Sequence, residues 1–76
     1  MIELQATTYL NMSQAFFQQK NFDKSIKKAT DSLNLKKTIK AYYRRGKAYA
    51  MLEKYENAAD DMKKAVLMDT SDPNEI

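Results

Sequence analysis

The chain contains no cysteine and no histidine. The first absence excludes a disulfide framework and a thiolate metal site, and the second removes the commonest catalytic base and metal ligand. Glycine and proline occur once each, at Gly46 and Pro73, whereas Lys, Ala, Leu, Met, Gln and Glu are abundant. Because helix interiors penalise glycine and proline most, this composition predicts an all-α chain, for which we expect no metal or other cofactor.

Long apolar runs are missing as well, and no stretch approaches the roughly 20 residues that a membrane-spanning helix needs. The chain opens with Met1-Ile2-Glu3, which places an acid where a signal peptide has a basic start. We therefore expect a soluble, cytoplasmic protein without a membrane partner. Its 76 residues predict a single domain, residues 1–76, whose core alone supplies about 3 to 5 kcal/mol of net stability.

The sequence nearly repeats itself with an offset of 33 residues. Six pairs of similar residue class keep this offset: Tyr9 and Tyr42, Ser13 and Gly46, Phe16 and Tyr49, Ser25 and Ala58, Ala29 and Met62, Ser32 and Ala65. A single match would mean little, but six in register, at places where two helices would touch, are hard to obtain by chance. The chain is therefore a repeat module.

Apolar periodicity predicts four helices, over residues 3–19, 22–35, 39–52 and 56–69. Asn21 and Thr38 are the expected N-caps of the second and third helices. Ser71-Asp72-Pro73 is expected to end the fourth helix or to begin another. Turns of two to four residues between the helices favour antiparallel packing, so we expect a helix-turn-helix twice over.

The periodicity also predicts which residues face inward. The expected inward positions are Leu4, Thr8, Met12, Ala15 and Phe16, then Ile26, Ala29 and Leu33, and finally Ala58, Ala59, Met62, Ala65 and Val66. Small residues at Ala15, Ser25, Gly46, Ala48 and Ala58 are expected where helices cross closely, and the aromatic residues Phe16, Phe22, Tyr49 and Tyr55 are expected in the core. Asp60 and Asp61 are expected on a solvated surface.

The repeated pattern of aromatic and small residues resembles the tetratricopeptide repeat. Residues 6–38 resemble one repeat and residues 39–72 the next, with Thr70 in place of the usual terminal proline. The second repeat matches more cleanly, through Tyr42, Gly46, Tyr49, Tyr55, Ala58, Met62 and Ala65. The resemblance implies two tandem hairpins, four antiparallel helices in all, that form a fragment of a right-handed α-solenoid.

Members of this family expose a concave groove lined by the first helix of each repeat. The repeat geometry assigns these residues to the groove: Thr7, Leu10, Asn11, Gln14, Phe17 and Gln18, beside Lys40, Tyr43, Arg44, Lys47 and Met51. Lys40, Arg44 and Lys47 are spaced so that all three cations share one helical face. The pattern has two interpretations, a solvated basic face or a site for an anion.

The run from Lys40 to Ala48, with Leu10-Asn11-Met12 one repeat earlier, resembles the dicarboxylate-clamp subclass of co-chaperones and large immunophilin-type peptidyl-prolyl isomerases. The resemblance implies that Asn11, Lys40 and Arg44 bind the carboxylates of an acidic C-terminal peptide, the Glu-Glu-Val-Asp tail of cytosolic heat-shock chaperones. A positive charge beside the planar fork of Arg suits carboxylates. The predicted peptide-binding residues are Asn11, Gln14, Lys40, Tyr43, Arg44 and Lys47.

The clamp is incomplete, because the subclass has three repeats and its first repeat supplies a further Lys and Asn. We therefore expect the chain to be part of a larger protein. Tyr43, with Phe17 and Met51, could shape a pocket for an apolar residue of the ligand or could simply pack.

Other functions were weighed on the same residues. A generic scaffold that binds another protein is the main alternative, as is self-association through uncapped ends at Ile2, Leu4, Val66 and Met68. The second leaves open a weakly stable monomer or a homo-dimer that exchanges hairpins. We expect no enzyme activity, because adjacent helical residues such as Asp60 and Asp61 point about 100° apart. Nucleic-acid binding is not expected, since acids are interspersed through a chain of net charge +3.

Overall fold

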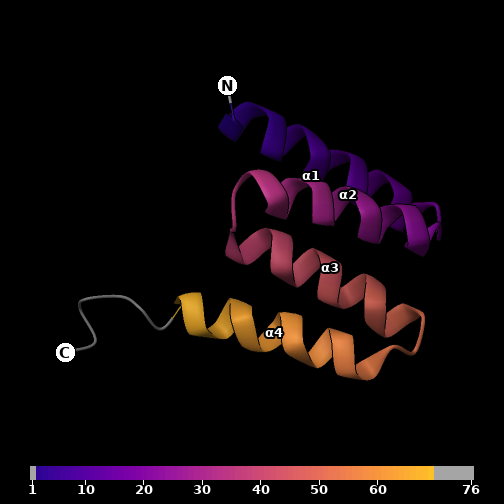
Figure 1. Ribbon diagram of the computed structural model, residues 1–76. Helices are drawn as coiled ribbons and strands as arrows, with labels where there is room; N and C mark the ends of the chain where they lie inside the picture. Colours follow the sequence, from indigo (N-terminus) through magenta and orange to yellow (C-terminus); the bar gives the residue numbers. More distant parts are fainter. Residues whose placement is uncertain (1, 70–76) are drawn as a thin grey trace.

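The computed structural model describes residues 2–69 and contains four α-helices there. They are α1 (Ile2–Gln18), α2 (Phe22–Leu35), α3 (Ile39–Met51) and α4 (Tyr55–Asp69). Figure 1 shows them side by side in chain order, with α1 and α4 at the two edges. The prediction of an all-α fold of paired helices is confirmed. The predicted stop at Ser71-Asp72-Pro73 lies outside the described residues.

The predicted caps begin two of the helices. The Asn21 side chain accepts a hydrogen bond from the backbone N–H of Lys24 at 3.4 Å, and Thr38 Oγ1 accepts one from the N–H of Ala41 at 3.1 Å. Each cap supplies an acceptor to an N–H that has no partner within its helix. These two caps therefore fix where α2 and α3 begin.

Each hairpin turns at a residue in the left-handed backbone region. Lys20 has φ 63° and Glu53 has φ 62°, and the two positions are separated by the repeat offset. The next N–H in each turn reaches back into the helix, from Asn21 to the Phe16 carbonyl at 2.8 Å and from Lys54 to the Tyr49 carbonyl at 2.9 Å. These bonds satisfy carbonyls at the ends of α1 and α3, so both helices end in the same way.

Packing proceeds from each helix to its neighbour in the chain. α1 packs on α2, α2 on α3 and α3 on α4, while α1 makes a smaller contact with α3; within residues 2–69, α4 packs on α3 alone. The core cluster joins both hairpins and consists of Leu10, Leu33, Ala41, Tyr42 and Ala65. No helix in this part of the chain has the length and apolar character to cross a bilayer.

The expected inward face of α1 is wrong. Leu4 is 66% exposed, Thr8, Met12 and Ala15 are also exposed, and the buried residues of α1 are Ala6, Leu10 and Ser13. The physical reason is that the apolar stripe lies on the side of α1 turned away from the described helices. Leu10, which was assigned to the groove, is instead a core residue.

Several expectations for α4 are also wrong. Ala59 and Val66 are exposed, and Tyr55, the first residue of the helix, is 65% exposed. Of the residues expected as exposed apolar ends, Ile2, Leu4 and Val66 are exposed, whereas Met68 is partly buried against the core cluster. Ala59 and Val66 are exposed for the same reason as the apolar stripe of α1, because α4 is an edge helix with a single neighbour among the described residues.

Asp61 is not on a solvated surface, for it is only 2% exposed and pairs with Arg45. Arg45 Nε donates to Asp61 Oδ2 and Nη2 donates to Oδ1, both at 2.8 Å, while Nη1 donates to Thr30 Oγ1 at 3.2 Å. These bonds to Asp61 are the main cause that raises the pKa of Arg45 above its ordinary value. A buried carboxylate is thus compensated by a planar two-point partner.

Small residues allow the helices of each hairpin to approach closely. A Cβ on Gly46 would lie 3.0 Å from Met62 Cε and 3.3 Å from the Ala58 carbonyl oxygen, so α3 and α4 are close at this point. Ser25, Ala48 and Ala58 are buried as expected, but Ala15 is exposed. The positions that lie between described helices were therefore predicted better than those on the outer side of α1.

Candidate functional site

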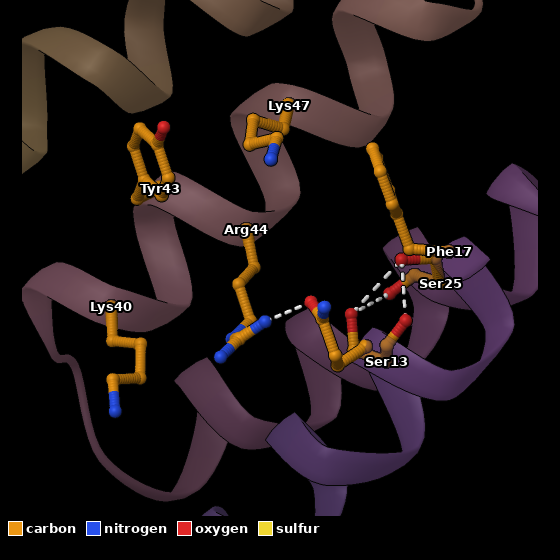
Figure 2. A pocket seen from close by; sticks show the side chains of 8 residues that line it. Ser13, Phe17, Ser25, Lys40, Tyr43, Arg44 and Lys47 are labelled. Carbon is orange, nitrogen blue, oxygen red and sulfur yellow. Dashed lines mark hydrogen bonds between the residues drawn. The ribbon is translucent and has the colours of Figure 1, made fainter.

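A pocket of about 260 Å³ lies between α1, α2 and α3. Its lining residues are Ser13, Gln14, Phe17, Ser25, Lys40, Tyr43, Arg44 and Lys47. Figure 2 shows Lys40, Tyr43, Arg44 and Lys47 on one helix, facing the side that carries Ser13 and Phe17. The pocket therefore combines cations from α3 with neutral and aromatic side chains from α1.

Positive charge dominates this pocket. Lys40, Arg44 and Lys47 all line it, and none of its described lining residues is acidic. The ion pairs found within residues 2–69 involve other cations, Lys28, Lys36 and Arg45. Like charges at neighbouring helical positions repel one another. Among the residues that the structure describes, the three cations thus lack the carboxylate partners that offset charge elsewhere.

Arg44 is held in place on one side of its guanidinium group. Its Nη1 donates a hydrogen bond to Gln14 Oε1 across the pocket, as the dashed line in Figure 2 shows. Its Nε is buried and has no acceptor among the described residues. A buried donor without an acceptor is unfavourable.

Lys47 lies between two aromatic rings. Its Nζ is 5.1 Å from the centroid of the Phe17 ring and 5.7 Å from that of Tyr43. Phe17 in turn packs edge-on against Phe22, with 5.2 Å between ring centroids. Aromatic faces attract a cation without neutralising it, so the ammonium group of Lys47 is positioned while its charge stays available to an anion.

Ser13 and Ser25 form the wall where α1 and α2 meet. Ser13 Oγ donates to the Ser25 carbonyl at 2.7 Å, and Ser25 Oγ donates to the Ser13 carbonyl at 2.9 Å. The two hydroxyl oxygens are 3.0 Å apart. Both hydroxyl protons are thereby used within the hairpin, so the serines shape the wall of the pocket and join α1 to α2.

The structure brings together most of the residues predicted from sequence. Gln14, Lys40, Tyr43, Arg44 and Lys47 all line the pocket. The shared face of the α3 cations follows directly from their spacing along the helix. Their convergence with Gln14 follows from the contact between α1 and α3.

Other predicted groove residues lie elsewhere. Asn11 is exposed on α1 and is not one of the described residues that line the pocket. Thr7, Gln18 and Met51 are exposed outside this lining too. Of the two residues expected to accompany Tyr43 in an apolar pocket, Phe17 therefore lies in it and Met51 does not.

The sequence reasoning missed the contribution of Ser13 and Ser25 to the pocket. A signal was present, because these serines occupy the positions that pair with Gly46 and Ala58 across the repeat. Polar hydroxyls at closely packed positions need partners, and the nearest ones lie on the facing helix. The hydroxyl pair was thus open to inference once the hairpin had been assigned.

As a whole, the pocket presents groups whose chemistry suits an anion. Arg44 offers a planar donor group for a carboxylate, and Lys40 offers a flexible point charge. Phe17 and Tyr43 add apolar surface beside these charges. The pocket therefore combines positive charge with apolar surface.

Comparison with known protein families agrees with the helical arrangement. The family model of the tetratricopeptide repeat matches residues 39–72, which include α3 and α4. No curated protein and no solved structure matches the chain. The four paired helices are consistent with two helix-turn-helix hairpins of this kind. Residues 39–72 therefore match the tetratricopeptide repeat, a module that is generally a non-catalytic scaffold for protein–protein interaction.

Proposed function

We propose that the pocket between α1 and α3 binds the acidic C-terminal peptide of heat-shock chaperones, as a partial carboxylate clamp. The observation that carries this proposal is the pocket lined by Lys40, Arg44 and Lys47, with no acidic residue among its described lining residues. A carboxylate in the pocket would accept hydrogen bonds from the guanidinium group of Arg44 and the ammonium group of Lys40. Such a peptide is cytosolic, and the proposal accordingly places the protein in the cytoplasm.

The two chemical types of residue in the pocket have separate roles in this proposal. Arg44 and Lys40 bind carboxylate oxygens, and Gln14 holds the guanidinium group of Arg44 toward the pocket. Phe17 and Tyr43 contact an apolar side chain of the peptide. Charged groups thus recognise the acidic end, and aromatic rings recognise the residue beside it.

Asn11 has a smaller role than the resemblance implies. It precedes Gln14 by three residues on α1, so the two positions are neighbours on the helix surface. We assign Asn11 to the outer edge of the site, where it contacts a longer peptide. Gln14 is then the neutral polar residue nearest to the bound carboxylate.

Binding is expected to be weak. A charge-assisted hydrogen bond contributes about 1.5 to 3 kcal/mol, and the Lys and Asn that a further repeat supplies in the subclass have no counterpart here. Losing two such anchors reduces a micromolar site to a millimolar one, since each factor of ten corresponds to about 1.4 kcal/mol. The test must therefore detect millimolar affinity.

The experiment is a two-dimensional NMR titration of isotope-labelled protein with a peptide ending in Glu-Glu-Val-Asp, its C-terminus free or amidated. We expect the free acid to shift the resonances of Gln14, Lys40 and Arg44 in a saturable manner. Amidation removes one carboxylate, so it should weaken binding several-fold. Lys40→Ala and Arg44→Ala should each reduce the affinity about tenfold, equivalent to the loss of one charge-assisted bond.

The matched control is Lys27→Ala, which removes the same charge from an exposed position on α2 outside the pocket. It should bind like the unaltered protein. Equal loss in Lys27→Ala and Lys40→Ala would show that only net charge matters. No shifts at millimolar peptide, with a folded spectrum, would refute the proposed ligand and leave a scaffold for another protein.

A further inference from the structure

The two edge helices each present a face without a neighbour among the described residues. On α1 this face carries Leu4, Thr8, Met12 and Ala15, all exposed, and we call it the open α1 face. On α4 it carries Ala59, Lys63 and Val66, also exposed, and we call it the open α4 face. The internal repeat of the chain shows how these two faces are related.

Positions that face inward within a hairpin are buried in both repeats. The pairs at the offset of 33 residues are Ser13 and Gly46, Ser25 and Ala58, and Ser32 and Ala65, and every one of these residues is buried. The offset found in the sequence therefore holds in the structure. These three pairs of equivalent positions have equivalent surroundings because the neighbouring helix is present in both repeats.

Positions that face between the hairpins behave differently. Ala41 and Ala48 on α3 are fully buried, but their equivalents Thr8 and Ala15 on α1 are exposed. α3 has α2 as a neighbour on this side, and α1 has no such neighbour within the described chain. The open α1 face is thus equivalent to the face of α3 that α2 covers.

The same difference appears on the other side of that interface. Leu33 on α2 is 5% exposed and belongs to the core cluster with Ala41, whereas its equivalent Val66 on α4 is 59% exposed. α2 packs on α3, and α4 has no following helix among the described residues. The open α4 face is therefore equivalent to the face of α2 that packs on α3.

We propose that copies of this chain stack head to tail, with α4 of one copy on α1 of the next, as α2 lies on α3 within one copy. The occupant of each open face is thus a second copy of the chain. Val66 of one copy would pack beside Thr8 of the next, at the places that Leu33 and Ala41 occupy in the internal interface. This inference rests on the exposed faces and not on ligand binding in the pocket.

The charges on the two faces are compatible with stacking. The internal interface contains a hydrogen bond between Thr30 on α2 and Arg45 on α3. Lys63 on α4 is equivalent to Thr30, and Met12 on α1 is equivalent to Arg45. In the proposed contact the cation is therefore on α4, and it faces an apolar residue on α1. The aliphatic part of Lys63 can cover Met12 while its ammonium group stays in water. No pair of like charges arises at this contact.

The proposed interface joins two different faces, so it does not close on itself. Such a heterologous contact leaves one open face at each end of every assembly and permits further growth. Because only one helix from each copy forms the contact, we expect weak association that increases steadily with protein concentration. The expected products are short chains of variable length, unlike the defined product of a symmetric dimer.

Sedimentation velocity over a wide range of protein concentrations tests the proposal. The unaltered chain should show a weight-average mass that rises with concentration. Val66→Lys blocks the open α4 face and Thr8→Lys blocks the open α1 face, so each variant alone should remain monomeric. An equal mixture should form a heterodimer and nothing larger, because each variant keeps the face that the other needs.

The matched control is Met51→Lys, which introduces the same charge at an exposed apolar position outside both faces. It should assemble like the unaltered chain. Self-association of Val66→Lys or Thr8→Lys alone would demonstrate a symmetric contact and overturn the proposal. A constant monomer mass of the unaltered chain up to millimolar concentration would overturn it too.

A second measurement covers the case in which a lysine variant fails to fold. The chain has no cysteine, so Val66→Cys and Thr8→Cys can each carry a single thiol of modest size. Under mild oxidation, a mixture should yield mainly the mixed disulfide between the two variants. Equal amounts of the two same-variant dimers, or no cross-link beyond that of Met51→Cys, would contradict head-to-tail stacking.

Discussion

The first hairpin (α1 and α2) and the second (α3 and α4) join their helices by different chemistry at equivalent positions. The first uses hydroxyl groups: Ser13 and Ser25 bond to each other's carbonyl groups, and Ser32 Oγ donates to the Ala6 carbonyl at 2.8 Å. The second hairpin has Gly, Ala and Ala at these places, as Gly46, Ala58 and Ala65. It relies on close approach of the helices and, within the described residues, on the ion pair of Arg45 and Asp61.

The comparison teaches that the repeat determines the positions at which two helices come into contact. Different kinds of interaction can stabilise the contact at these positions. Neutral hydroxyl bonds spread the stabilisation of the first hairpin over three side chains. The ion pair of Arg45 and Asp61 concentrates it at one point in the second. The second hairpin should therefore be the more sensitive to a single substitution.

The largest expected effect comes from Asp61→Ala, which leaves Arg45 without its partner. Breaking a buried ion pair costs about 3 to 5 kcal/mol, and we expect about 3 kcal/mol here because the side chain of Arg45 is still 18% exposed. That loss equals most of the roughly 3 to 5 kcal/mol expected for a domain of this size. Urea unfolding followed by circular dichroism measures it.

Asp60→Ala is the matched control for Asp61→Ala, because it removes the neighbouring carboxylate, which is exposed. It should change stability by less than about 0.5 kcal/mol. Equal effects of the two substitutions would mean that the ion pair does not stabilise the second hairpin more than a surface charge does.

A smaller effect is expected when the first hairpin is given the chemistry of the second. The double substitution Ser25→Ala and Ser32→Ala removes hydrogen bonds that cost about 1 kcal/mol each to lose, while alanine returns part of this through its higher helix propensity. We expect a net loss of about 1 kcal/mol in urea unfolding. A gain in stability would show that the serines are not needed to join α1 and α2.

Features that depend on residues nearby in the sequence could be predicted, whereas features that depend on packing against another helix could not. The N-caps Asn21 and Thr38 and the helices they begin were predictable, because capping and periodicity are local properties. The orientation of α1 was not predictable from its apolar stripe, since Leu4 and Met12 satisfy helical spacing whether or not another helix covers them. Periodicity shows that a face exists, but it does not show what packs on it.

The site residues, too, fall into those that could be predicted within one helix and those that depend on packing between helices. The shared face of Lys40, Arg44 and Lys47 could be predicted from spacing within one helix, and the structure places all three in the pocket. Asn11 and Gln14 on α1 were both predicted with the help of the family resemblance, and of these two the rotation of α1 puts only Gln14 in the lining. The Arg45–Asp61 pair was missed, although both residues occupy inward stripes, beside Tyr42 and Ala58, where a charge needs a partner.

The smallest expected effect concerns the end of the first hairpin, where Lys36 Nζ lies 2.5 Å from Glu3 Oε2. The hydrogen bond and charge of Lys36 lower the pKa of Glu3. A lowered carboxyl pKa means that this contribution is complete above the ordinary Glu pKa and is lost as the pH falls through the lowered value. Because Glu3 is exposed, the effect on stability should be slight and should weaken with salt.

An NMR pH titration of the Glu3 carboxyl carbon measures this shift directly. Lys36→Met should raise the pKa of Glu3 back toward its ordinary value, while Lys37→Met, at the next exposed position, should not. If the pKa of Glu3 is the same in all three proteins, the pair between α1 and the end of α2 does not form in solution.

Arg45 also has a consequence for how the chain unfolds. Its guanidinium group bonds to Asp61 on α4 and to Thr30 on α2, although it belongs to α3. Unfolding of either hairpin therefore breaks a hydrogen bond of Arg45, and this loss also destabilises the other hairpin. In a repeat protein such coupling between units decides cooperativity. We accordingly expect the two hairpins to melt in one transition, with amide exchange in α2 and α3 limited by opening of the whole domain.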